Sequence, residues 1–371
     1  MKVSPMADYK KQTKRRGFLL HLVRSALWKE EFASFEMPSN AVRSLFRLAK
    51  EQTVEGLVSE SLMRNNVRLP KEDAFQVYKI NLDVTESNAI INKALSELCV
   101  LLTENHVKFV VVKGQTIAAL YRVPEMRTPG DIDFYCDEQN FQKAKDVIAK
   151  NWHVEYEDDT ESEQHVAFSY KDVTFELHFC LMKFASPSNQ RKFDAYMKES
   201  QWDKISIGDV EVPILSPELN ILYTFLHLYH HLIELGVSIR QFCDLAVLAD
   251  HLQIRKDLLE TMLNDIGFMR AFKTVGCILV DYLGLPKEKF PFQLSRKDRK
   301  HIGYMFDIIF EHGNFGMHRR KYEMRSGLGY YMDSFKTKLS HYWHLYKLSP
   351  KECRAVLALY VPKKILQAVK R

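Results

Sequence analysis

The sequence lacks long apolar runs, paired cysteines and internal repeats, and each absence excludes a class of protein. No apolar stretch approaches the ~18 residues of a membrane-spanning helix, so we expect no membrane span. The six cysteines are scattered without a Cys-x-x-Cys pair, which is typical of reduced, mostly buried thiols. Because repeats and low-complexity segments are also absent, we expect an ordinary globular protein of the cytoplasm.

The N-terminal segment lacks the pattern of a signal peptide. A basic patch, Lys10 to Arg16, precedes the apolar stretch Phe18 to Leu22, but this stretch soon meets Arg24 and Lys29. An amphipathic helix that touches a membrane is the less favoured alternative. We expect residues 1–16 to form a flexible basic tail.

Strong charge is lacking as well, since the 371 residues carry a formal net charge of +6 and the pI is about 8.8. This mildly basic balance fits an anionic ligand such as a nucleotide but falls short of a nucleic-acid-binding signature. Nucleic acid is therefore possible as a partner but not indicated. The composition, 46% hydrophobic and 27% charged, is typical of a globular protein, and the length predicts two or three subdomains.

Helix and strand patterns divide the rest of the chain into three parts. Apolar residues recur at helical spacing through 17–104, which predicts an N-terminal helical region. Strand patterns gather in 105–215, an α/β core that we expect to contain a small mixed sheet, a short helix over 117–121 and a minor strand at 154–156. Helical patterns resume in a C-terminal helical domain, 216–371. The predicted fold class is α+β, a small mixed-sheet core flanked by two helical regions.

The most informative stretch runs from Val107 to Phe134. Its residues 109–112 have the apolar, β-branched pattern of a buried strand, and a Lys-Gly turn ends it. A second strand pattern begins at Asp131, and residues two apart in a strand point to the same face. Asp131 and Asp133 therefore aim their carboxylates in one direction. Either they are two solvated aspartates at a strand edge, or they hold Mg²⁺, which removes the repulsion between them.

A third strand pattern, Val173 to Phe179, contains one acid, Glu176. Its apolar residues alternate with Thr174, Glu176 and His178, so one face is apolar and the other polar. Three carboxylates on adjacent strands can hold two metal ions for in-line displacement at phosphorus. The alternative is that Glu176 is an outward-facing acid on a half-exposed strand.

These residues carry a resemblance to a known family. The chain resembles the uncharacterised bacterial nucleotidyltransferases of the DNA polymerase β-type superfamily in this order of motifs: a strand, Lys113-Gly114, a helix, Arg127-x-x-x-Asp131-x-Asp133, and a strand with Glu176-x-His178. A second block is similar to the family's His…Gly…Leu-Arg-Gln…Asp-Leu pattern, with isoleucine for leucine: His230-His231, Gly236, Ile239-Arg240-Gln241 and Asp244-Leu245. The turn at 313–316 is similar too. The resemblance covers the chain from about Trp28 to the end.

The resemblance implies an activity and a set of site residues. The activity is the transfer of an NMP from an NTP to the hydroxyl of an unknown acceptor, with release of pyrophosphate and with Mg²⁺ or Mn²⁺ held by Asp131, Asp133 and Glu176. The residues expected to contact substrate are Lys113, Gly114, Gln115, Arg127, His178, His231 and Arg240. The superfamily usually has Gly-Ser or Gly-Gly where this chain has Gly114-Gln115. Phosphate binding would therefore depend more on the lysine and on backbone N–H groups.

Several of these residues have alternatives at the level of the sequence. Arg127 either pairs with phosphate or braces the loop before the aspartates. Arg240 either meets phosphate, oriented by Asp244, or forms an ion pair within its own helix, since the two are four apart. His227 and His231 share a helix face, where hydrogen-bonded side chains are favoured over a zinc site that lacks a third ligand.

Other functions remain open for the chain as a whole. One is a non-catalytic nucleotide-binding or regulatory module on the same fold. Another is a phosphotransferase or hydrolase that uses the same carboxylates. A third is a basic helical scaffold that binds RNA. The basic stretch within 313–329 either contacts an anionic acceptor or a triphosphate, or is a solvated loop.

Overall fold

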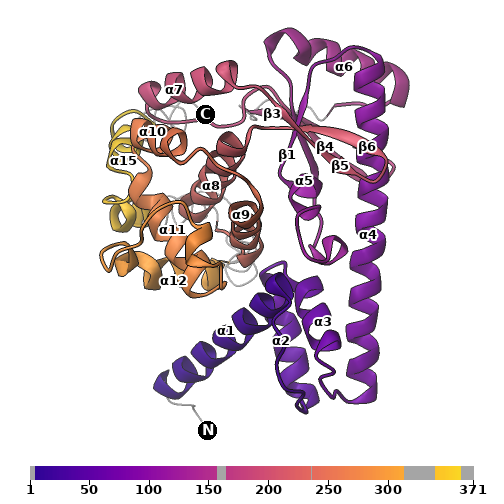
Figure 1. Cartoon of the computed structure of the whole chain (residues 1–371), viewed down its shortest axis with the longest axis vertical. Coiled ribbons are helices and arrows are strands. Elements are labelled where there is room, and N and C mark those ends of the chain that lie inside the picture. The colour runs from indigo at the N-terminus through magenta and orange to yellow at the C-terminus, as the bar shows by residue number, and fades with distance from the viewer. Residues whose placement is uncertain (1–4, 157–163, 235, 313–338, 361–371) are drawn as a thin grey trace, which may run out of the picture.

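The computed structural model describes residues 5–156, 164–234, 236–312 and 339–360. It has the predicted α+β class: a small mixed sheet lies between an N-terminal helical region and a C-terminal group of helices (Figure 1). The long helix α4 (Lys71–Glu104) runs along one side of the molecule and connects the N-terminal helices to the sheet. The basic stretch and the predicted turn at 313–316 lie outside the described residues.

The N-terminal region begins earlier than the sequence patterns predict. Its first three helices are α1 (Pro5–Trp28), α2 (Ser39–Glu51) and α3 (Glu55–Arg64). Helix α1 therefore extends through most of the segment 1–16, where a flexible tail is predicted. That segment has no glycine or proline after Pro5, so nothing in its sequence stops a helix there.

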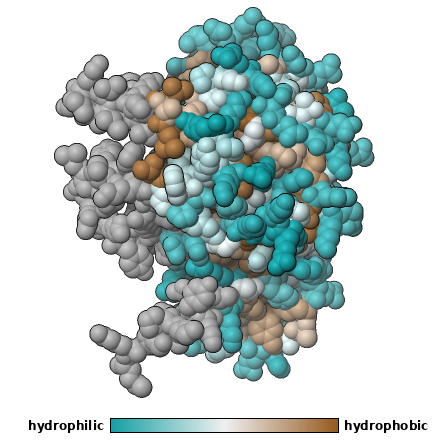
Figure 2. Space-filling view, turned by 90° about the vertical axis from the view of Figure 1, so that its left-hand side faces the viewer, coloured by the Kyte–Doolittle hydropathy of each residue, from teal (hydrophilic) through white to brown (hydrophobic). Residues whose placement is uncertain are grey.

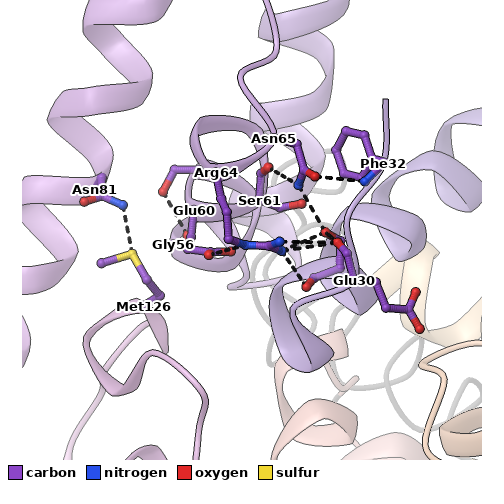
Figure 3. Close-up of polar contacts among 11 residues, drawn as sticks. Glu30, Phe32, Gly56, Glu60, Ser61, Arg64, Asn65, Asn81 and Met126 are labelled. Atoms are coloured by element: carbon purple, nitrogen blue, oxygen red, sulfur yellow. Dashed lines mark hydrogen bonds and ion pairs between the residues drawn. The ribbon is translucent and has the colours of Figure 1, made fainter. Parts of the chain in front are cut away.

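Arg64 joins α3 to the C-terminal end of α1 (Figure 3). Its guanidinium donates to the Ser25 carbonyl at 2.7 Å and to Glu60 Oε1 at 2.7 Å. Asn65, the next residue, accepts from the backbone N–H of Phe32 at 2.9 Å. The last carbonyls of a helix have no partner within the helix, so these contacts fix the end of α1.

The sheet has four strands in the order β1-β2-β4-β3: β1 (Val110–Val112), β2 (Ile132–Tyr135), β3 (His165–Tyr170) and β4 (Val173–His178). Strands β2 and β4 are parallel, and the other pairs are antiparallel. One face is apolar and packs on α4 and on α6 (Glu138–Trp152), with Phe168 and Phe175 stacked at its centre. The other face carries the polar residues of β4, so the predicted alternation along this strand is confirmed.

Two predictions in the core are wrong. Residues 154–156 form no strand, and the short helix α5 (Gly114–Ala118) begins directly after β1 and not at 117. Helix α7 (Pro187–Glu199) was not predicted, although Ser186 accepts from the Asn189 N–H as an N-cap before a proline. Two further strands after α7 form a separate hairpin, β5 (Asp203–Ile207) and β6 (Val210–Ile214).

The C-terminal helices follow β6. They are α8 (Pro217–Glu234), α9 (Ile239–His251), α10 (Lys256–Ile266), α11 (Met269–Asp281), α12 (Ile302–His312) and α15 (Pro350–Ala355), which runs into a π-helical turn, Val356–Tyr360. Gly267, whose φ of +77° ends α10, separates α10 from α11. Helix α9 starts with a capping box made by Ser238 and Gln241.

The N-terminal region docks on the C-terminal helices through buried polar contacts. Gln52, with 1% of its surface exposed, donates to the Ile309 carbonyl at 3.0 Å and accepts from the Ile239 N–H at 3.0 Å. The indole of Trp28 donates to the Leu283 carbonyl at 2.5 Å. The N-terminal region therefore fixes the first turn of α9 through the hydrogen bond between Gln52 and the Ile239 N–H.

Figure 2 shows the side of the molecule that carries α10, α12 and α15. Hydrophilic residues dominate this face, and hydrophobic ones form only small patches on it. Among the described residues, no helix is long and apolar enough to cross a membrane.

Candidate active site

A cavity of about 350 Å³ lies between the polar face of the sheet and the helices α8 and α9. Nine of the ten residues that the sequence analysis assigns to the site line it: Lys113, Gly114, Arg127, Asp131, Asp133, Glu176, His178, His231 and Arg240. The structure therefore brings together residues that lie up to 127 positions apart in the chain. Gln115 is not among the lining residues.

Three carboxylates converge on one wall of the cavity. Asp133 on β2 is the direct neighbour of Glu176 on the parallel strand β4, and Asp131 immediately precedes β2. Oxygen atoms of the three side chains lie within 4.8 Å of one another. The negative charge of Asp133, together with burial, raises the pKa of Asp131 to about 6. This repulsion and the all-oxygen donor set fit a hard divalent cation.

Asp133 is also contacted by two basic groups. Lys113 Nζ lies 3.0 Å from Asp133 Oδ1, and His178 Nε2 lies 2.8 Å from the same oxygen. Burial on its own would raise the pKa of Asp133, but Lys113 and His178 hold it well below its usual range. Burial would likewise lower the pKa of Lys113, but the charge of Asp133 raises it. We therefore assign a charged lysine and a charged aspartate to this pair.

The turn after β1 places Lys113 in this position. Lys113 has a φ of +57° and Gly114 a φ of +49°, so two successive residues adopt the left-handed region. This conformation is uncommon for lysine and costs free energy, and such strain gathers at functional sites. Glycine, which has no Cβ, adopts such a φ at little cost, so it suits the position of Gly114.

Histidines of α8 form the opposite wall. His227 Nε2 lies 3.3 Å from Lys113 Nζ, and the His227 and His231 rings are 4.4 Å apart. Burial, with the charges of His230 and Lys113, lowers the pKa of His231 to about 3, and burial also lowers that of His227. Both rings are therefore neutral. No metal-binding group of three side chains among the described residues includes either of them.

Arg127 braces the loop before the aspartates. Its guanidinium donates to both carboxylate oxygens of Asp244, from Nε at 2.7 Å and from Nη2 at 2.9 Å. Tyr121 donates its hydroxyl to the same carboxylate at 2.6 Å. The alternative ion pair of Arg240 with Asp244 within α9 is therefore wrong, because a residue from a distant loop occupies the aspartate.

Arg240 instead points to the loop that leads into β2. Its Nη1 donates to the Thr128 carbonyl at 2.9 Å, and its Nε has no hydrogen-bond partner among the described residues. Burial, and then the nearby Arg127, lowers its pKa. Arg240 is thus a cation beside the carboxylates with part of its hydrogen-bonding capacity unused.

Gln115 contacts the long helix and not the cavity. Its amide donates to Asn92 Oδ1 at 2.6 Å and to Asn88 Oδ1 at 3.1 Å, both on α4. Asn88 in turn donates to the carbonyls of Glu125 and Arg127. Gln115 therefore helps to hold the loop before the aspartates in place.

The sequence alone did not identify His165, which lies on β3 and lines the sheet side of the cavity. It is the cross-strand partner of His178, because Tyr170 and Val173 close the β3–β4 hairpin around Lys171-Asp172. Both turn residues have positive φ, as a tight two-residue hairpin turn requires. Counting back along both strands from that turn would have placed His165 next to His178.

The chain belongs to the family described as "Uncharacterised nucleotidyltransferase", whose model matches residues 38–284. The chain is also similar to a solved structure of an antigenic nucleotidyltransferase-like protein from Paracoccidioides brasiliensis. The identity is 15% and the TM-score 0.34, over 52% of this chain and 92% of that one, and a likeness this low carries no argument about mechanism. No curated protein matches the chain.

Proposed function

We propose that the chain is a nucleotidyltransferase of the DNA polymerase β type, which moves an NMP from an NTP to a hydroxyl and releases pyrophosphate. The observation that carries this proposal is the convergence of Asp131, Asp133 and Glu176 on adjacent strands, next to the buried cations Lys113 and Arg240. Family membership supports the reaction class. The acceptor is not identified by it.

The three carboxylates are the residues that would hold Mg²⁺ or Mn²⁺. When bound, such a cation supplies charge neutralisation for a triphosphate and for the developing charge at phosphorus. Asp131 gains most from it, since its pKa is raised by the unrelieved charge of Asp133.

The chain's own cations and backbone would position the triphosphate. Arg240 has an Nε without a partner, and planar guanidinium groups suit phosphate oxygens. Lys113 supplies a second positive charge at the turn, and the Gly114 backbone lets the ligand approach closely. Glu176 lies at the edge of the carboxylate set that faces the histidines, where it would accept a hydrogen bond from the attacking hydroxyl.

A second cavity, of about 400 Å³, offers a place for the acceptor. It shares Gln164, Met182 and His230 with the first cavity, so the two adjoin. Its other lining includes the rings of Phe184 and Phe268. An acceptor with an apolar body would fit here and present its hydroxyl toward the carboxylates.

One observation favours the alternative of a non-catalytic nucleotide-binding module. Lys113 and His178 both contact Asp133 Oδ1 and neutralise the charge of this carboxylate. A module of this kind would bind an NTP without consuming it, whereas the enzyme would release pyrophosphate.

The test is a thermal-shift screen of the four NTPs, each with and without Mg²⁺. We expect one NTP to raise the melting temperature only with Mg²⁺, and the Asp131→Asn/Asp133→Asn variant to lose this shift. Asp209→Asn, an exposed aspartate of the β5–β6 turn, is the matched control and should keep it. With the NTP thus identified and labelled, release of pyrophosphate separates the enzyme from the binding module, and release of phosphate or NDP would indicate a hydrolase or phosphotransferase. The absence of any shift would contradict the proposal.

A further inference from the structure

Two imidazoles flank Glu176 on the side away from Asp131. His165 on β3 and His178 on β4 are register partners, and Glu176 precedes His178 by two positions, so all three side chains share one face of the sheet. All three line the cavity between the sheet and α8.

Donor atoms of these three residues lie close enough together to serve as ligands of one metal ion. His165 Nε2 lies 3.7 Å from Glu176 Oε1, and His178 Nε2 lies 3.4 Å from Glu176 Oε2. Both distances exceed the range of about 2.7–3.2 Å for N–H···O hydrogen bonds. Ligand atoms about 2.1 Å from a tetrahedral cation lie about 3.4 Å from one another. One donor atom from each of the three residues lies within 4.8 Å of the other two.

We propose that His165, Glu176 and His178 form a metal site of their own, beside the carboxylate set, which takes a borderline divalent cation such as Zn²⁺, Co²⁺ or Mn²⁺ in preference to Mg²⁺. Imidazole ligands suit these cations, whereas Mg²⁺ prefers oxygen ligands. Two histidines and one carboxylate also leave a coordination position open, and here it faces the cavity. The assignment goes beyond the proposed function and holds whether or not the chain transfers nucleotides.

The surroundings of His178 allow it to serve as a ligand. Its Nε2 lies 2.8 Å from Asp133 Oδ1, and a nitrogen that binds a metal presents a lone pair there in place of a proton. The cation would therefore replace this hydrogen bond, while Asp133 keeps Lys113 at 3.0 Å. Nδ1 of His178 has no partner among the described residues, so no second contact fixes the proton on Nε2.

The two metal positions would share Glu176 but differ in their other ligands. The carboxylate position depends on Asp131 and Asp133, and the imidazole position depends on His165 and His178. Removal of Asp131 should thus spare the imidazole position, and removal of His165 should spare the carboxylate position. Single substitutions can therefore distinguish the imidazole position from the carboxylate position.

The experiment titrates metal-free protein with Co²⁺, followed by visible absorption, and with Zn²⁺, followed by calorimetry. The wild-type chain should give the intense visible bands of tetrahedral Co²⁺. His165→Gln, which keeps hydrogen-bonding capacity but loses the ligand, should abolish these bands and weaken Zn²⁺ binding by about tenfold or more. The tetrahedral Co²⁺ bands should persist in Asp131→Asn. His21→Gln, which replaces an exposed imidazole on α1, should change neither the bands nor Zn²⁺ binding. Circular dichroism of the metal-free variants confirms that each is folded.

Three results would overturn the assignment: a weak octahedral Co²⁺ spectrum in the wild-type chain, unchanged Zn²⁺ binding in His165→Gln, or equal loss of binding in Asp131→Asn. The last would show that one carboxylate site accounts for all the binding. NTP turnover with Mg²⁺ is measured separately. If the chain transfers no nucleotide, the Co²⁺ and Zn²⁺ titrations still test the imidazole site.

Discussion

At the scale of single residues, Asp133 is contacted by two basic groups of the site. Lys113 and His178 both approach its Oδ1, and 4% of its side chain is exposed. A buried carboxylate is expensive to leave unpaired, so this lysine stabilises the fold as well as the site. From the sequence, Lys113 is predicted only to bind phosphate, because the sequence around a lysine at the end of a strand does not reveal which charged side chain it contacts in the fold.

Lys113→Met tests the strength of this pair. We expect the free energy of unfolding to fall by about 2–3 kcal/mol, somewhat less than for most broken buried pairs because His178 still donates to Asp133. The cost should shrink by about 1 kcal/mol or more in an Asp133→Asn background, where no charge is left unpaired. Urea unfolding of the four proteins in this double-mutant cycle measures both numbers.

The control for this prediction is Lys171→Met. Lys171 Nζ contacts Glu97 at 2.8 Å, but that pair lies at the surface. Its removal should give no resolvable change in unfolding. If Lys113→Met behaved like this control, Lys113 would contribute nothing to the stability of the fold.

Spacing along the sequence does not identify the ion-pair partner of Asp244. The four-residue spacing of Arg240 and Asp244 favours a pair within α9, but Arg127 binds Asp244 from 117 positions away. Arg127 donates two short hydrogen bonds to Asp244, and Tyr121 donates a third to the same carboxylate. These contacts replace the ion pair that the spacing within α9 favours. Contacts of this kind depend on the packing of the loop against α9, and no periodic pattern records them.

At the scale of elements, the strands were predictable because each buries one apolar face. In β4, Val173, Phe175 and Leu177 are at most 4% exposed, and the acid between them points to the cavity. The alternation along each strand predicted that Asp133 and Glu176 lie on the polar faces of their own strands, but it did not predict that these two strands are neighbours. The parallel pairing of β2 with β4, which makes these two carboxylates adjacent, follows from the tertiary fold. Helix α7 lacked a strong apolar stripe and was missed for that reason.

Helix α8 leads to a prediction about pH. His227 and His231 are neutral when folded because burial lowers their pKa, that of His231 to about 3. Below the ordinary pKa of 6.5 the unfolded imidazole binds a proton that the folded one does not bind. The free energy of unfolding is therefore highest above that pH. It falls as the pH drops below 6.5, by about 1.4 kcal/mol per pH unit for each imidazole.

His231→Gln should remove one imidazole's share of this slope. We expect the variant and the wild-type chain to differ little at pH 8, where both rings are neutral in both states, and the variant to lose less stability between pH 6.5 and pH 5. Denaturant unfolding at each pH gives the two slopes. Parallel slopes would mean that His231 takes up a proton in the folded state.

At the scale of the whole molecule, the site depends on three regions that meet around it. The sheet supplies the carboxylates and two histidines, α8 supplies His227 and His231, and α9 supplies Arg240. The N-terminal region holds the first turn of α9 through Gln52. The helical content of the flanking regions was evident from the sequence. Their docking was not, because a buried glutamine that joins two regions looks like any polar residue at the end of a helix.

Gln52→Ala should loosen this docking. The substitution removes the hydrogen bonds that Gln52 makes to the Ile239 N–H and to the Ile309 carbonyl, which predicts a loss of about 3 kcal/mol in the free energy of unfolding. Hydrogen exchange at the Ile239 amide should become at least about tenfold faster, since its protecting partner is gone. Gln142→Ala, which removes an exposed contact to Asp146 within α6, should change stability by less than about 0.5 kcal/mol. If the Ile239 amide stayed protected in Gln52→Ala, the first turn of α9 would hold its position without the N-terminal region, and Arg240 would be placed by the sheet and α9 alone.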